Sequence, residues 1–172
     1  MSSSEHRMRR DLLRAALVAL AATAAGCGFQ LRGTATYPFD TVYVAAPVGA
    51  PFTAELKRAL SGSGSAKLTE SPEKAQVILD VTLIANDKAV LSLSPGGRVR
   101  EFAIAKRVQF RLRDNEGHEW LPGDEIVVRR TYLYDDTERL AREIQEQRLD
   151  KDMQTDAIQQ IVRRLQSAKK PA

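Results

Sequence analysis

The single cysteine of this 172-residue chain, Cys27, is the side chain whose surroundings most clearly indicate chemistry. It lies between Gly26 and Gly28, directly after an alanine-rich run, residues 15–25, that carries no charge. A thiol can pair in a disulfide, act as a nucleophile or be modified on its sulfur. Because the chain has no second cysteine, an internal disulfide is excluded. The position therefore favours covalent modification of the sulfur.

A positively charged segment precedes this apolar run, which is the layout of an export signal. The run is eleven residues long, whereas a helix needs about 20 apolar residues to cross a bilayer. We therefore expect residues 1–26 to be a leader that is removed, and residues 27–172 to form the mature chain. The basic residues of the leader are Arg7, Arg9, Arg10 and Arg14.

Residues 24–27, with the sequence AAGC, resemble the lipobox of bacterial lipoproteins. The resemblance implies cleavage before Cys27, a diacylglycerol on its sulfur and acylation of its new amino group. One acyl chain binds a bilayer only marginally, but three chains anchor a protein stably. Gly28 stands where lipoproteins retained at the inner membrane typically carry aspartate, which implies the periplasmic side of the outer membrane. The alternatives are an unmodified cysteine that follows an ordinary cleaved signal, or an apolar run that forms a short buried helix.

The other reactive side chains of the mature chain form no recognisable catalytic or ligand set. His118 is the only histidine after the leader, and Glu119 beside it adjoins an expected hairpin loop. Asp135 and Asp136 have no histidine or carboxylate cluster at ligand spacing. No glycine-rich phosphate loop is present. We therefore predict no enzymatic activity, no metal and no cofactor; an exported enzyme would need a catalytic group outside this set.

The charge balance argues against nucleic-acid binding. The net charge is +4 for the whole chain. The leader holds four arginines against Glu5 and Asp11, so its removal leaves +2. Nucleic-acid-binding domains normally show a basic stripe or a recognition motif. The remaining 146 residues, 172 less 26, are the size of one ordinary domain.

The hydrophobic pattern predicts an α+β domain. Residues 41–46 form a β-branched strand, and Pro51 suits the first position of a helix. Apolar residues at alternate positions over 77–93 predict a long strand, and a three-residue loop at 115–117 predicts a later hairpin. Residues 153–165 have helical spacing. The order strand, helix, three strands, helix predicts two helices on one face of a mainly antiparallel sheet of about four strands.

The loop of the central hairpin predicts the register of its two strands. A two-residue turn at 96–97 pairs Pro95 with Arg98. The same register sets Asp87 opposite Lys106, so we expect a cross-strand ion pair, either structural or marking where this face meets solvent or a partner. It also turns one apolar set toward the helices: Val81, Leu83, Ala85, Ala89 and Leu91.

Residues 27–33, with the sequence CGFQLRG, resemble the start of mature members of the LptE family. The resemblance continues through the order of helices and strands and through RLARE at 139–143. It implies a non-enzymatic outer-membrane lipoprotein that plugs the LptD β-barrel and assists assembly of lipopolysaccharide at the outer membrane surface. The alternative is a free-standing, periplasm-facing lipoprotein that binds a ligand or a protein without a barrel partner.

The same resemblance implies contacts with lipopolysaccharide. In the family these involve basic residues near the tip hairpin and after a Leu-Ala pair before the last helix. Arg142 matches the second position, and Arg98 and Arg100 lie near the first. Guanidinium groups suit the phosphates of lipid A, and Leu93 and Phe102 lie close enough in sequence to meet acyl chains. The alternative is a solvated hairpin end that keeps a long strand pair soluble.

Overall fold

The computed structural model describes residues 36–47, 50–134 and 139–171, so the predicted leader and Cys27 lie outside the described residues. The predicted order of elements is confirmed, with two short additions between the first helix and the long strand. In chain order the elements are β1 (Thr41–Ala45), α2 (Pro51–Ser63), β2 (Lys67–Leu68), η1 (Pro72–Lys74), β3 (Val77–Leu93), β4 (Val99–Arg113), β5 (Glu119–Leu133) and α3 (Arg139–Gln166).

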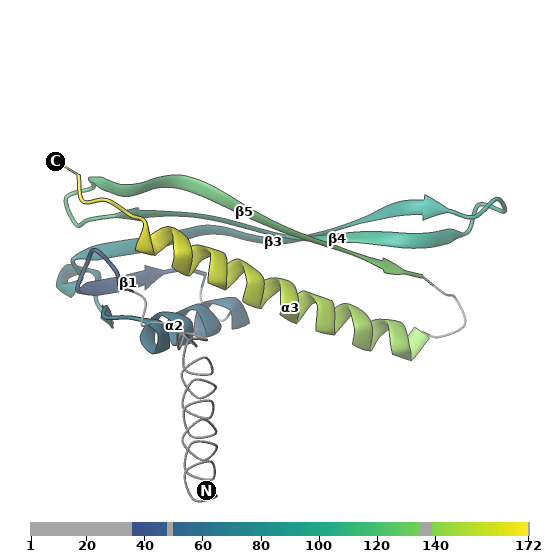
Figure 1. Ribbon diagram of the computed structural model, residues 1–172, viewed down its shortest axis with the longest axis horizontal. Helices are drawn as coiled ribbons and strands as arrows, with labels where there is room; N and C mark the ends of the chain where they lie inside the picture. Colours follow the sequence, from purple (N-terminus) through teal and green to yellow (C-terminus); the bar gives the residue numbers. More distant parts are fainter. Residues whose placement is uncertain (1–35, 48–49, 135–138, 172) are drawn as a thin grey trace, which may run out of the picture. The chain divides into compact units, whose positions relative to one another are not determined.

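The strands form one sheet in the order β2-β1-β3-β4-β5. β1 runs parallel to β2 and β3, and the β3–β4 and β4–β5 pairs are antiparallel. Both helices lie on the same face of this sheet (Figure 1). The predicted α+β class is therefore confirmed. The strand that the sequence did not predict, β2, has two residues, which is too short to produce an alternating pattern.

The helices bury their apolar faces between themselves and the sheet. Pro51 starts α2, and Phe52, Leu56 and Leu60 recur at four-residue spacing and are buried. Among residues 142–166 of α3 the buried side chains begin at Met153, and Leu149 before it is half-buried against the same core, so mainly the second half of this helix packs into the core. Among the described residues, no helix is both long and apolar enough to span a membrane. The sheet residues that meet the helices include Val42, Val44, Val77, Leu79, Val81, Val108, Phe110, Leu112 and Ile126.

The predicted register of the central hairpin is wrong by one residue. Its loop has three residues, 95–97, because the Ser94 N–H donates to the Arg98 carbonyl at 2.7 Å. A two-residue turn of the expected kind needs positive φ at both central residues. Only Gly97 adopts it, at 77°, and Pro95 supplies the fixed φ that suits the start of an ordinary turn. The register shifts accordingly, and the expected pairing of Asp87 with Lys106 is not formed.

An irregularity in β3 adds to this error. The pairing with β4 shifts between Val81 and Leu83, which leaves Thr82 as an extra residue. Val81 is buried as expected, but Leu83 is opposite the exposed Gln109 and is 36% exposed. Past the extra residue the alternation is inverted. The predicted inward positions Leu83, Ala85, Ala89 and Leu91 are therefore wrong, and none of them is buried.

The second hairpin follows its prediction. The Asp114 N–H donates to the His118 carbonyl at 3.0 Å, and Gly117 has a φ of 93°. The Asp114 carboxylate accepts backbone N–H groups of Glu116 and His118 at 3.0 and 2.9 Å, and its second oxygen lies 3.2 Å from His118 Nδ1. His118 therefore supports this loop.

Candidate functional site

The predicted lipopolysaccharide contacts gather toward the end of the sheet that carries the β3–β4 loop, called here the distal end. Arg98 directly follows that loop and Arg100 lies near the start of β4, and both are exposed. Arg142 lies in the first turn of α3 and is half-buried. These residues come from elements about 40 positions apart in the chain, so any grouping depends on the fold.

Tyr134, directly after β5, joins two of these positions. Its backbone N–H donates to the Arg100 carbonyl at 2.7 Å, which extends the β4–β5 ladder by one bond. The Arg142 guanidinium carbon lies 4.3 Å from the centre of the Tyr134 ring. Such a separation allows a cation–π attraction. The fold therefore brings Arg142 and the backbone of Arg100 to one tyrosine, whereas Arg98 lies farther along, directly after the loop.

Tyr134 belongs to a group of three aromatic rings, with Phe102 and Tyr132. Phe102 meets Tyr134 edge to face with ring centres 5.0 Å apart, and it lies 5.7 Å from Tyr132. Phe102 and Tyr132 are cross-strand partners in β4 and β5, which places them on one face of the sheet. The Lys88 ammonium lies 4.5 Å from the Phe102 ring centre and 5.5 Å from that of Tyr132.

Glu146 of α3 completes the arrangement. One of its carboxylate oxygens accepts hydrogen bonds from Lys88 Nζ at 2.7 Å and from the Tyr132 hydroxyl at 2.8 Å. The bond from Lys88 lowers the pKa of Glu146, and that from Tyr132 adds to this. Burial acts to lower the pKa of Lys88, but the contacts with Glu146 and Tyr132 outweigh it and raise that pKa. Both groups are therefore charged at neutral pH.

We call this group the distal cluster; it consists of Lys88, Phe102, Tyr132, Tyr134, Arg142 and Glu146. The sequence analysis identified Arg142 and Phe102 as candidates but missed Lys88 and Glu146. Lys88 was missed because the wrong register placed it on the opposite face from Phe102, whereas it shares that face. Tyr132 and Tyr134, at alternate positions of the sequence, are the signal that could have indicated the remaining members.

Exposed apolar side chains also lie at the distal end, on both faces of the sheet, because Val90 pairs with Phe102 whereas Leu133 pairs with Glu101. Val90, Leu91 and Leu93 of β3 are 50%, 55% and 58% exposed, and Leu133 at the end of β5 is 70% exposed. The exposed guanidinium groups of Arg98 and Arg100 follow the β3 residues of this set in the chain. An apolar surface bordered by cations suits an amphiphile with an anionic headgroup. Within the described residues there is no group of three or more histidine, cysteine or acidic side chains placed to hold a metal ion.

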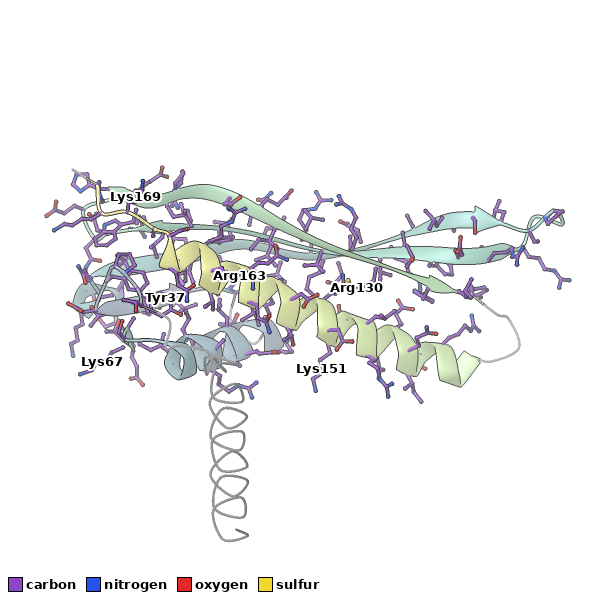
Figure 2. The ribbon with its side chains drawn as sticks, in the orientation of Figure 1. Tyr37, Lys67, Arg130, Lys151, Arg163 and Lys169 are labelled. Carbon is purple, nitrogen blue, oxygen red and sulfur yellow. The ribbon has the colours of Figure 1, made fainter. Side chains whose placement is uncertain are left out.

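Three further ion pairs join α3 to the sheet; one is between Arg164 Nε and Asp124 of β5, at 3.2 Å. Lys106 is 3% exposed, and its ammonium lies 2.9 Å from Asp150 and 2.8 Å from the Asn86 side-chain oxygen. Arg130 of β5, which Figure 2 shows at the side of the sheet facing α3, pairs with Asp156. The predicted ion pair of Lys106 with Asp87 is therefore wrong. Asp87 instead lies 2.9 Å from Arg107, whose side chain has the opposite orientation to that of Lys106.

Several known proteins are similar to this chain over most of its length. The chain is 26% identical over 162 residues to the LPS-assembly lipoprotein LptE of Yersinia enterocolitica, and the alignment covers 92% of this chain and 77% of that protein. The solution structure of uncharacterized lipoprotein B from Nitrosomonas europaea is similar with a TM-score of 0.70 and 39% identity. It covers 79% of this chain and 88% of the other.

A more distant solved structure has the same fold. The crystal structure of rare lipoprotein B from Shewanella oneidensis matches with a TM-score of 0.65 and 22% identity, and covers 74% of this chain and 95% of that one. The family model described as LptE, lipopolysaccharide-assembly, matches residues 39–165, which include every element from β1 to nearly the end of α3. The chain therefore belongs to the LptE lipopolysaccharide-assembly family.

Proposed function

We propose that this protein is an outer-membrane lipoprotein that partners an LptD-type β-barrel as a plug and assists assembly of lipopolysaccharide at the outer membrane surface. Family membership supports this proposal, as does the Yersinia relative that carries the name LPS-assembly lipoprotein. Cys27 is the proposed site of the lipid anchor, on the periplasmic side of the membrane. The anchor raises the local concentration of the barrel and does not itself form the contact.

The distal cluster is the observation on which the proposed lipopolysaccharide contact rests. It fixes the Arg142 guanidinium against a ring at the end of the sheet where the exposed leucines, Arg98 and Arg100 also lie. Guanidinium groups bind phosphate through paired hydrogen bonds, and apolar side chains can contact acyl chains. We assign Arg98, Arg100 and Arg142 as headgroup contacts.

The first experiment tests the barrel partnership. The chain is purified from native membranes in mild detergent with its anchor intact, and the co-purifying proteins are identified by mass spectrometry. We expect a much larger β-barrel in equimolar amount. Recovery of the chain alone would instead favour the alternative, a free-standing lipoprotein that binds a ligand or protein without a barrel.

The second experiment tests the assigned arginines. Replacement of Arg98, Arg100 and Arg142 by glutamate should weaken binding of purified lipopolysaccharide about tenfold or more, since each loses a charge-assisted contact. Lys67, Lys151 and Arg163 are exposed and lie outside the distal cluster, so their replacement by glutamate is the matched control for net charge. Equal effects of the two triple variants would overturn the assignment. Circular dichroism checks that both variants are folded.

The third experiment tests the anchor. Cys27→Ser should release the chain from membranes when it is expressed without a barrel, yet leave barrel binding measurable when both are expressed together. A Cys27→Ser chain that stays fully membrane-bound with no barrel present would show that the lipid on this residue is not the anchor.

A further inference from the structure

One edge of the sheet is left open along most of β3. β1 pairs with β3 only from Val77 to Asp80. Beyond Asp80, β3 has β4 on one side, and no described strand pairs with its other side. The chain turns from β1 into α2 after Ala45, so it leaves this edge uncovered. A row of unpaired backbone N–H and C=O groups is a template for another strand.

The central part of this edge is regular. From Leu83 to Val90 the pairing with β4 runs without a shift, and the irregularities lie on either side, at Thr82 and after Val90. Residues 83–90 therefore offer eight consecutive positions, which is an ordinary strand length. No proline occurs in this segment. β5 is the other long edge, but it contains Pro122, and proline blunts an edge.

Two cavities lie along the regular segment. The first has a volume of about 510 Å³ and lies between β3 and α3, with Asp87, Lys88 and Glu143 in its wall. The second has a volume of about 480 Å³ and extends toward α2. Asn86 of β3 and Asp150 of α3 line both cavities. The two spaces therefore adjoin each other on the helix-bearing face of the sheet, next to the open edge, where they can hold the side chains that an added strand directs toward α3.

The α3 wall of this channel is acidic. Glu143, Glu146 and Asp150 recur at helical spacing and all line the first cavity, together with Asp87. Lys88 neutralises Glu146, Lys106 neutralises Asp150 and Arg107 neutralises Asp87. Glu143 is exposed and forms no ion pair with any described residue. Glu143 therefore leaves one unneutralised carboxylate in the first cavity, whereas the second is also lined by Arg58 and Lys151. An unneutralised carboxylate beside an open strand edge favours an extended segment that carries a basic side chain.

We propose that residues 83–90 of β3 accept an extended segment of a partner protein by strand addition. Backbone hydrogen bonds to the open edge would supply most of the affinity, and lysine or arginine side chains at alternate positions would face Glu143 and its neighbours. This inference goes beyond the proposed function and does not depend on it, because neither lipopolysaccharide nor the anchor takes part.

The test uses the full chain in mild detergent and a fluorescent eight-residue peptide in which lysine alternates with valine and threonine. We expect saturable binding by fluorescence anisotropy and slower deuterium exchange, by about tenfold, in the amides of residues 83–90. A second peptide has every backbone nitrogen methylated, so that neither of its edges can donate, and a third has glutamate in place of lysine. Both should bind at least about tenfold more weakly.

Two variants of α3 test the acidic wall. Glu143→Lys should weaken the lysine peptide about threefold to tenfold. Asp152→Lys is the matched control, because Asp152 is an exposed acid on the opposite side of the same helix and lines neither cavity. No binding, equal binding of the methylated peptide, or protection of β5 in place of β3 would each overturn the proposal. Equal effects of the two variants would overturn the role assigned to the acidic wall.

Discussion

The Tyr132 hydroxyl and Lys88 Nζ donate to the same oxygen of Glu146, at 2.8 and 2.7 Å. This shared acceptor joins β5 and β3 to the first half of α3. From residue 142 to residue 152 no side chain of this helix is buried, so apolar packing contributes little there. Polar contacts therefore position the helix segment that carries Arg142.

Tyr132→Phe should lower the free energy of unfolding by about 1 kcal/mol, because it removes one donor to a carboxylate and keeps the ring. The matched control is Tyr134→Phe, since the Tyr134 hydroxyl forms no hydrogen bond with the described residues. Its ring contacts with Phe102 and Arg142 remain. Urea unfolding measures both. Equal losses would contradict the role of the Tyr132 hydroxyl.

The pKa of Glu146 predicts how stability depends on pH. That pKa is lowered in the folded protein, mainly by Lys88. The stabilising contribution is therefore complete above the ordinary glutamate pKa of about 4.3 and is lost as the pH falls through the lower folded value. Glu146→Gln should be less stable than the natural chain at pH 7, and the difference should shrink below about pH 4. Thermal unfolding from pH 7 to pH 3 measures this; a constant difference would contradict it.

The sequence predicted the elements whose pattern is local. The helix that begins at Pro51 and the three-residue loop at 115–117 are each determined by residues only a few positions apart, and these predictions are confirmed. The register of β3 depends on a choice between two loops and on one extra residue at Thr82. The alternation of apolar residues alone does not distinguish the two loops or reveal the extra residue. A register shift of one position moves every side chain of the strand to the other face of the sheet.

The candidate site shows the same division. Arg142 was identified by resemblance, but its contact with Tyr134 depends on where α3 crosses the sheet. Glu146 and Lys88 are 58 positions apart, and only the fold brings them together. A charged residue in an alternating strand is normally read as outward-facing. Lys88 lies instead against Phe102, where its long side chain covers an aromatic surface.

Substitutions of Lys106 and Asp150 should change the free energy of unfolding by different amounts. Lys106→Met keeps the buried apolar stem, and Asp150 is 42% exposed and can hydrate, so the free energy of unfolding should change by less than about 1 kcal/mol. Asp150→Ala leaves a buried ammonium with Asn86 as its remaining partner, and should cost about 3 kcal/mol. The double variant should recover most of that loss. Urea unfolding of all three tests this, and a larger cost for Lys106→Met would contradict it.

The two glycines of the β3–β4 loop provide a test of its geometry. Gly97 has a φ of 77°, so Gly97→Ala should lower the free energy of unfolding by about 1 kcal/mol through backbone strain alone, because nothing lies within 4 Å of the added carbon. Gly96 has no such φ, and its nearest neighbour is the Ser94 hydroxyl at 4.0 Å. Gly96→Ala should therefore cost less than about 0.5 kcal/mol. A two-residue Gly-Gly turn would need positive φ at both positions and would make both substitutions costly. Urea unfolding of the two variants thus distinguishes the three-residue loop, and the strand register that follows from it, from the two-residue alternative.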